Sequence, residues 1–110
     1  MTESRLQSTC YQWYHETFIH FRGLLCYNLN NSRNRVQGAM DKGMGLQKGR
    51  SDMVLYYSGK AYHIELKLEG EKQTPDQNVW QKTVETNGFT YKLIYSLEEF
   101  KIYIKGVIIT

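Results

Sequence analysis

Two strand-like segments separated by a two-residue turn restrict the fold of this chain more than any other feature. Met53–Tyr57 and Ala61–Leu68 are rich in aliphatic and aromatic residues, and Ser58-Gly59 lies at the turn between them. This arrangement predicts a β-hairpin, and a two-residue turn fixes the pairing register of the two strands. Tyr57 then pairs with Lys60, and every step back along the first strand matches a step forward along the second.

The predicted register gathers charged side chains at the open end of the hairpin. Asp52 falls opposite Glu65, and directly opposed residues share one face of a sheet with Cβ atoms about 4.5–5.5 Å apart. Lys67, two residues beyond Glu65, emerges on the same face, whereas Ile64 and Leu66 point the other way into a core. The sequence therefore predicts two carboxylates and an ammonium group side by side.

Two opposed carboxylates repel each other, and a cation between them is the usual explanation. All-oxygen ligands favour Mg²⁺, Mn²⁺ or Ca²⁺ over zinc. Mg²⁺ held by one or two carboxylates keeps several waters, and one of these can become a nucleophile that a nearby lysine helps to orient. On these residues alone, the alternative is two exposed acids at a strand end, with Lys67 in a surface ion pair.

Signals around the hairpin predict a mixed α/β domain. Thr74-Pro75 is typical of a helix start, with threonine as N-cap and proline at the first position, and Ser96 is expected to cap a last helix. The length of 110 residues fits one domain over residues 1–110. Helices are expected over Ser4–Phe18, Val36–Met44, Pro75–Thr86 and beyond Ser96, and further strands over Leu24–Tyr27 and Phe89–Tyr95.

Composition and local patterns exclude several classes of protein. No run of 18 apolar residues exists and no signal peptide is visible, so we expect no membrane partner. The two cysteines, Cys10 and Cys26, are too few for a disulfide scaffold, so we expect a reduced intracellular protein in which both are small buried side chains. Gly45–Ser51 is one residue too short for a P-loop and precedes a strand, so no nucleotide cofactor is expected.

Positive charge is concentrated in one glycine-rich segment. Residues 33–50 carry five bases against one acid, whereas the whole chain has a net charge of only +3. Flexible backbone with basic side chains is typical of a phosphate-binding surface, and a solvated basic loop explains the charge equally well. The candidate DNA-binding residues are Arg33, Arg35, Lys42, Lys48 and Arg50.

Short motifs along nearly the whole chain resemble those of one nuclease family. They are Glu3 with Leu6-Gln7, Gly49-Arg50-Ser51-Asp52, Glu65-Leu66-Lys67, Gln73-Thr74-Pro75 with Gln77 and Trp80, and Gly88-Phe89 leading to Tyr95–Phe100. In order, they resemble the first-helix E-x-x-hydrophobic-Q, G-x-x-D, E-x-K, helix-glutamine and closing strand-helix patterns of the VRR-NUC nucleases. That family belongs to the PD-(D/E)XK superfamily. Ser51 stands where a proline often precedes the aspartate, and this proline is not a ligand.

The resemblance implies a compact PD-(D/E)XK fold, with a central mixed sheet flanked by helices, and a catalytic role for five residues. Asp52, Glu65 and the backbone carbonyl of Leu66 would hold Mg²⁺ or Mn²⁺, and Glu3 would reach the metal directly or through water. Lys67 would position or activate the attacking water. Gln77 would orient the site or contact the substrate.

Two assignments have rivals. Glu16 competes with Glu3 as the acid of the first helix, but the two lie on nearly opposite helix faces. Gln7, one turn from Glu3 on the same face, favours Glu3, as in the family pattern. His63 is two residues before Glu65, and it is either a packed or solvent-facing imidazole or a residue at the edge of the site.

The resemblance implies a minimal, stand-alone, phage or bacterial nuclease that acts on DNA in the cytoplasm. We expect a structure-selective endonuclease similar to Holliday-junction resolvases of DNA repair and recombination, because so small a domain has little surface for reading long sequences. A homodimer would suit two symmetry-related strands, with Tyr11, Trp13, Tyr14 and Phe18 as candidate interface residues. The alternatives are a nicking or restriction-type nuclease on simple duplexes and a non-catalytic DNA-binding module.

Overall fold

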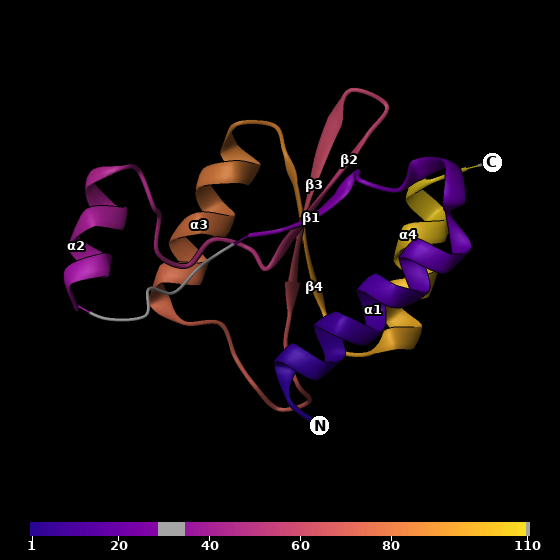
Figure 1. Ribbon diagram of the computed structural model, residues 1–110, viewed down its shortest axis with the longest axis horizontal. Helices are drawn as coiled ribbons and strands as arrows, with labels where there is room; N and C mark the ends of the chain where they lie inside the picture. The colour runs from indigo at the N-terminus through magenta and orange to yellow at the C-terminus, as the bar shows by residue number, and fades with distance from the viewer. Residues whose placement is uncertain (29–34, 110) are drawn as a thin grey trace.

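The computed structural model describes residues 1–28 and 35–109, so Arg33 of the predicted DNA-binding set lies outside the described residues. Four strands form one sheet in the order β1-β2-β3-β4. β1 and β3 run antiparallel to β2, whereas β3 and β4 are parallel. The elements are α1 (Glu3–Thr17), the 3₁₀ helix η1 (Ile19–Phe21), β1 (Leu25–Tyr27), α2 (Arg35–Gly43), β2 (Met53–Tyr57), β3 (Lys60–Leu66), α3 (Pro75–Thr86), β4 (Thr90–Ile94) and α4 (Leu97–Val107) (Figure 1).

The hairpin of β2 and β3 has the predicted register. Tyr57 pairs with Lys60 and Met53 with Ile64. Ser58 and Gly59 both have positive φ, at 51° and 77°. Two successive left-handed residues form the type I′ turn whose twist matches that of the flanking strands. The turn therefore sets the position of every residue along the two strands.

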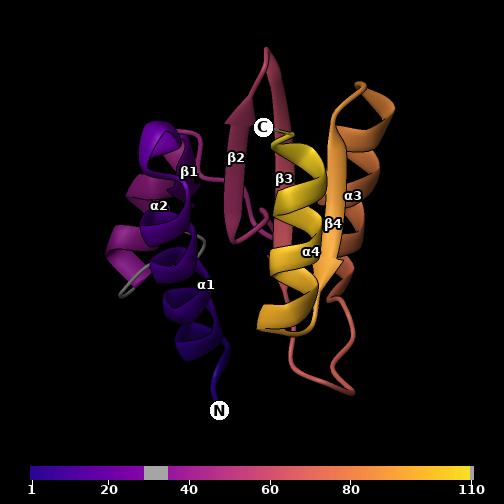
Figure 2. The same ribbon diagram turned by 90° about the vertical axis from the view of Figure 1, so that its right-hand side faces the viewer.

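Helices cover both faces of the sheet. α1 and α4 pack on one face and α3 on the other, while α2 lies farther out on the α3 side (Figures 1 and 2). α3 connects β3 to β4, as parallel neighbours require a crossover. The main core lies between the sheet and the α1–α4 pair, and its fully buried side chains include Leu6, Cys10, Tyr14, Leu55, Ile64, Leu66, Ile94, Phe100 and Ile104.

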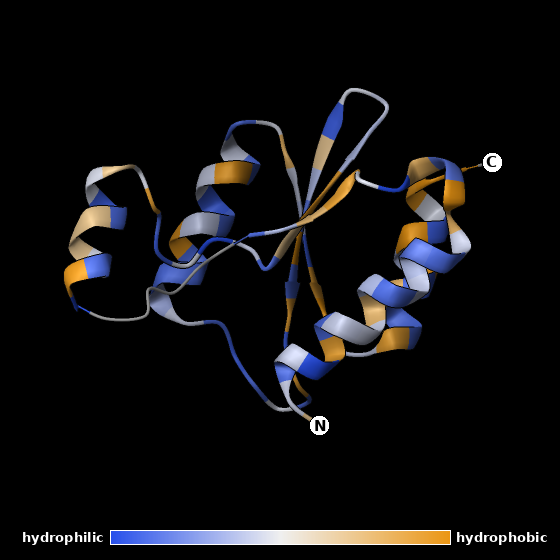
Figure 3. Ribbon diagram, viewed as in Figure 1, coloured by the Kyte–Doolittle hydropathy of each residue, from blue (hydrophilic) through white to orange (hydrophobic). Residues whose placement is uncertain are grey.

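Hydropathy follows this layered arrangement. Hydrophobic residues concentrate in the strands and α4, whereas the connection from β3 to α3 is hydrophilic (Figure 3). None of the described helices has the length and apolar character needed to span a bilayer. The expected N-caps are present, since the side chains of Thr74 and Ser96 accept the backbone N–H groups of Gln77 and Glu99.

Strand β3 ends at Leu66, two residues before the predicted end. The Leu68 N–H donates to the Glu71 carboxylate at 2.6 Å, and the Glu71 N–H donates to the Leu68 carbonyl at 3.0 Å. These two bonds turn the chain away from the sheet. Lys67 still donates its N–H to Ile94 at 3.0 Å, so its backbone follows the line of the strand.

The aromatic residues expected at a dimer interface belong mostly to the core. Tyr14 is 1% exposed, and its hydroxyl donates to the Phe21 carbonyl at 2.6 Å. Trp13 and Phe18 pack edge to face against each other and against the core, which leaves Tyr11 as the exposed member. For Tyr14 the assignment was wrong, because helical spacing alone does not say which aromatic side chains meet the sheet. The homodimer itself stays a prediction.

The two cysteines are free thiols. Cys10 is fully buried in α1, as expected, and burial raises its pKa to about 12. Cys26 in β1 is only partly buried, which departs from the expectation. β1 is an edge strand, so its outer residues are covered less completely than those of α1.

Candidate active site

The hairpin register places the Asp52 and Glu65 side chains together at the end of β2 and β3. Asp52 lies one residue before Met53, whose pairing with Ile64 ends the ladder, and its Oδ2 accepts the N–H of Leu66 at 2.8 Å. Its carbonyl accepts the N–H of Asn28 at 2.9 Å. Asp52 is therefore fixed both to β3 and to the end of β1.

Glu65 is held from the opposite side by Gln77 of α3. Gln77 Nε2 donates to Glu65 Oε2 at 3.0 Å. Its Oε1 accepts the N–H of Thr74 at 2.9 Å, and its own N–H donates to Thr74 Oγ1 at 3.2 Å. Because the amide oxygen closes the capping box of α3, the amide nitrogen is the end that faces Glu65. One side chain thus both starts the helix and orients a carboxylate.

The second oxygen of Glu65 accepts no hydrogen bond from any of the described residues. Glu65 is 1% exposed, and its Oε1 is buried without a hydrogen bond. Buried polar atoms are almost always paired, and an unpaired buried carboxylate oxygen is costly. Oxygen donors from two adjacent carboxyl groups suit a hard divalent cation. The orphaned oxygen and its neighbour Asp52 therefore fit Mg²⁺ or Mn²⁺.

The protonation equilibria show how unfavourable this pair is without a cation. The pKa of Glu65 is raised to about 9, chiefly by burial and in smaller part by the charge and contact of Asp52. Burial also raises the pKa of Asp52, against the hydrogen bond from the Leu66 N–H. A cation between the two groups would replace the proton that this arrangement otherwise retains.

Lys67 brings a buried positive charge to the same place. Lys67 is 6% exposed, although long cationic side chains are seldom buried. Its charge lowers the pKa values of Asp52 and Glu65. Burial raises both pKa values and is the larger effect. The ammonium group predicted beside the two carboxylates is therefore within electrostatic range of both.

Glu3 reaches the site from α1 but has a partner of its own. It lines the same cleft as Asp52, whereas Glu16 is exposed elsewhere on the helix. Burial raises the pKa of Glu3 to about 7, and its contact with the Glu71 carboxyl and the charge of that group add to the rise. Of the two candidate acids, Glu3 is the one that lies near Asp52, and its carboxyl group contacts that of Glu71.

Sequence reasoning did not single out Glu71. Its position depends on the turn after β3, where Gly70 has φ 85°, and not on strand or helix periodicity. A polar loop directly after the E-x-K triplet was the only available signal. Across residues 1–28 and 35–109, no three His, Cys, Asp or Glu side chains are gathered as a ready metal cage. The carboxyl groups instead lie in two pairs, Asp52 with Glu65 and Glu3 with Glu71.

Gly49 allows the loop that carries Asp52 to touch the start of α3. Its φ is 75°, and a Cβ atom at this position would overlap the backbone of Asp76. The loop and the helix therefore meet backbone to backbone. This contact fixes the distance between the element carrying Asp52 and the helix carrying Gln77.

Contacts of the buried Ser51 with His63 and Asn28 anchor the loop that carries Asp52. Ser51 is fully buried, its Oγ lies 3.1 Å from His63 Nδ1, and its carbonyl accepts Asn28 Nδ2 at 3.1 Å. The His63 ring packs edge-on against Trp80 and Phe89. Burial lowers the pKa of His63, with a smaller effect from Arg50, so the imidazole is neutral near pH 7. Of the two interpretations of His63, the structure supports a packed imidazole.

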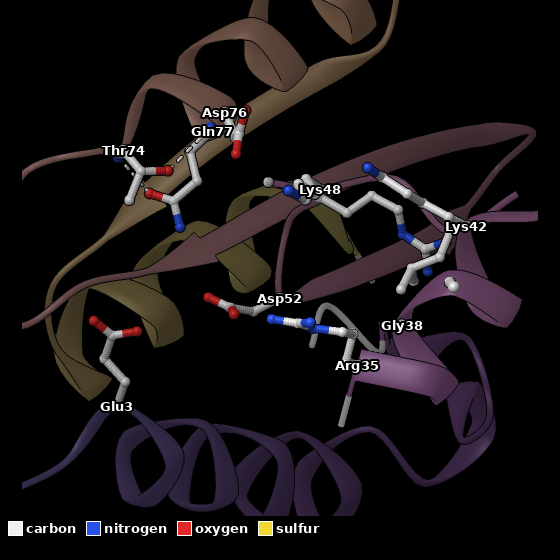
Figure 4. A pocket seen from close by; sticks show the side chains of 13 residues that line it. Glu3, Arg35, Gly38, Lys42, Lys48, Asp52, Thr74, Asp76 and Gln77 are labelled. Carbon is white, nitrogen blue, oxygen red and sulfur yellow. Dashed lines mark hydrogen bonds between the residues drawn. The ribbon is translucent and has the colours of Figure 1, made fainter. Parts of the chain in front are cut away.

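A cleft of about 810 Å³ opens above Asp52 and Gln77 between α1, α2 and α3. Figure 4 shows Glu3 extending from α1 on one side of Asp52 and Arg35 on the other, with Lys48 and Lys42 along the upper side of the opening. Arg50 also lines the cleft. Four of the five predicted phosphate-binding side chains thus line the same opening as Asp52. The sequence could not establish this because it does not show how α2 is oriented toward the sheet.

Comparison with known proteins supports the fold. Neither a protein-family model nor a curated protein sequence matches the chain. A solved structure described as a VRR_NUC domain protein is similar over 98% of this chain and 88% of that one, with 21% identity and a TM-score of 0.78. A second, described as a VRR_NUC domain, matches over 96% and 97%, with 19% identity and a TM-score of 0.65. The chain thus has the fold of these VRR_NUC domains, a mixed four-strand sheet flanked by helices.

Replacing Gly49 by alanine should disrupt the site more than the same change at Gly45. Both glycines have positive φ, so each substitution adds backbone strain of about 1–2 kcal/mol. A Cβ at Gly45 meets open space, whereas one at Gly49 meets α3. We expect Gly49→Ala to weaken Mn²⁺ binding at least about tenfold, as measured by calorimetry, and Gly45→Ala to leave it nearly unchanged. Equal effects would show that the contact with α3 is unimportant.

The metal-free protein should lose stability as pH rises. Glu65 has a raised pKa of about 9 in the folded state, so between about pH 5 and pH 9 the folded chain binds more protons than the unfolded chain. Stability contributed by the protonated carboxyl is full at low pH and is lost through this window. The melting temperature should fall accordingly, and Glu65→Gln should reduce the slope. Glu98→Gln, an exposed control, should keep it; an identical slope in both variants would contradict the account.

Proposed function

We propose that this chain is a divalent-metal-dependent endonuclease that hydrolyses phosphodiester bonds in DNA and selects its substrates by structure. One observation carries the proposal, namely a buried Glu65 carboxylate with one oxygen bound by Gln77 and the other unpaired beside Asp52. The similarity to two solved VRR_NUC domains supports a nuclease. The cleft lined with arginine and lysine supports an anionic polymer as substrate.

Each residue has a definite task in this proposal. Asp52 and Glu65 would hold Mg²⁺ or Mn²⁺, with the Leu66 carbonyl and Glu3 as further donors. When bound, the ion would supply Lewis-acid stabilisation of charge on the phosphoryl group. Gln77 keeps the Glu65 carboxylate in one orientation. Lys67 would donate a hydrogen bond to the attacking water and offset the negative charge that develops in the transition state.

The chemistry of the cleft supports a substrate preference based on DNA structure and not on sequence. Its basic lining comes from α2 and the loop before β2, so it offers charges for phosphate groups. Phosphate contacts position a nucleic acid but do not read its sequence. A four-way junction similar to the substrate of a Holliday-junction resolvase is the first DNA to test, beside duplex, flap and single-stranded DNA.

Removing the charge of either carboxylate should abolish cleavage and spare binding. Asp52→Asn and Glu65→Gln keep the shape of each side chain but weaken a hard-cation site. We expect wild-type protein with Mg²⁺ or Mn²⁺ to cut the junction, and each variant to lose more than about 10³-fold in rate while its DNA affinity, measured without metal, stays within about threefold.

The exposed Glu98→Gln variant serves as the matched control and should cut at the wild-type rate. Wild-type turnover in Asp52→Asn or Glu65→Gln would refute the metal-site assignment. DNA binding by wild-type protein without cleavage of any substrate in either metal would favour a non-catalytic binding module. Preferential cutting of simple duplex would favour a nicking or restriction-type nuclease.

Lys67→Ala should lower turnover by about 10²-fold or more without weakening metal binding. The lysine acts on water and the transition state in this proposal and is not a ligand. Single-turnover cleavage and Mn²⁺ calorimetry separate the two effects. An unchanged rate together with weaker metal binding would assign Lys67 to metal retention instead.

The basic residues of the cleft should govern the salt dependence of DNA binding. For the triple variant with alanine at Arg35, Lys42 and Lys48, the slope of log K against log salt should fall by about 0.9 per lost phosphate contact on duplex DNA. A variant with alanine at Lys60, Lys92 and Lys105, which removes the same charge outside the cleft, should keep the wild-type slope. Equal slopes in the two triple variants would mean that the segment is a solvated basic loop.

A further inference from the structure

A second, smaller groove lies beside the acidic site, and its lining differs in kind from that of the basic cleft. It has a volume of about 320 Å³ and runs between α1 and β1. Two tyrosines, Tyr11 and Tyr27, line it and are 39% and 63% exposed. We call it the Tyr11–Tyr27 groove; its other lining residues are Ser4, Gln7, Ser8 and Met53.

The groove combines aromatic faces with hydrogen-bonding groups. Ser4, Gln7, Ser8 and Tyr11 follow the spacing of a single helix face. Within the described part of the chain, no hydrogen bond engages the side chains of Ser4, Gln7 or Ser8. The Tyr11 ring is held by stacking on His15, with ring centroids 5.8 Å apart. Rigid aromatic rings beside free amide and hydroxyl groups suit a flat ring with polar edges, which is the chemistry of a nucleobase.

The groove and the basic cleft border each other at the start of α1 and at the start of β2. Glu3 lines the cleft and the next residue, Ser4, lines the groove. Likewise, Asp52 lines the cleft and the next residue, Met53, lines the groove. Tyr27 pairs with Met53 in the sheet, so it lies at the groove wall beside this boundary. Because Asp52 and Met53 point to opposite faces of the sheet, a strand whose phosphate lies at Asp52 would pass around the end of β2 to place a neighbouring base on the tyrosine side.

We propose that the Tyr11–Tyr27 groove binds an unpaired nucleobase of the cleaved strand, adjacent to the phosphate held at the acidic pair. This inference rests on the proposed nuclease function and deepens it. A base within a duplex must first be unstacked, whereas a base at a gap or a branch point is already free. The groove therefore selects DNA that carries an unpaired nucleotide beside the cleavage position.

Binding to two matched DNAs tests the groove without any cleavage. Full-length protein in EDTA is titrated with a fully paired duplex and with the same duplex carrying one unpaired nucleotide. Tyr11→Ala and Tyr27→Ala should each lower affinity for the second DNA by about 5- to 150-fold, the range for one lost base–aromatic contact. Affinity for the paired duplex should change less than about twofold.

Conservative and distant variants control for damage to the fold. Tyr11→Phe and Tyr27→Phe keep the ring and should bind both DNAs within about threefold of wild type. Tyr56→Ala, which removes an exposed tyrosine of β2 outside the groove, should have no selective effect. With 2-aminopurine as the unpaired base, wild-type protein should quench its fluorescence and Tyr27→Ala should not.

Three results would overturn the inference: equal losses on both DNAs, no loss on either, or a changed oligomeric state of the DNA-free alanine variants in sedimentation. The last would identify the groove as a contact between two copies of the chain. If no metal supports cleavage but the selective loss remains, the nuclease proposal fails and the groove assignment stands. If cleavage occurs without selective loss, the groove assignment alone fails.

Discussion

The burial of the Glu65 carboxylate beside Asp52 is the constraint on which the rest of the site depends. A carboxylate with 1% exposure and one unpaired oxygen is unfavourable in a fold held mainly by apolar packing. The β2–β3 register nonetheless places the second acid next to it. Stability given up at such a point is typical of functional sites, where the groups needed for chemistry override local packing preferences.

Three separate elements hold this arrangement in place. Gln77 binds Glu65 with the same amide that caps α3, so the start of that helix and the orientation of the carboxylate are coupled. Gly49 brings the loop before β2 onto α3, and the Ser51–His63 contact ties the loop to β3. Asp52 is thereby positioned by backbone contacts and buried polar groups, which gives the site the rigidity that binding a small ion requires.

Local chemistry in the sequence was sufficient to predict the parts of the fold that depend on neighbouring residues. Ser58-Gly59 fixed the hairpin, and Thr74-Pro75 located the start of α3. Contacts between segments far apart in the chain could not be predicted from local sequence. Nothing local indicates that Gly49 meets Asp76, that Glu71 meets Glu3, or that α2 turns its bases toward Asp52. The burial of Tyr14, expected at an interface, likewise depends on how α1 packs on the sheet.

Asp52 and Glu65 are proposed to form one cation site. A crystal structure of the wild-type protein with Mn²⁺, using anomalous scattering to locate the ion, tests this proposal directly. The account predicts a single strong peak within about 2.0–2.3 Å of both carboxylates, close to the range for hard divalent ions. A peak between Glu3 and Glu71 alone, or no peak near Glu65 at saturating Mn²⁺, would contradict it.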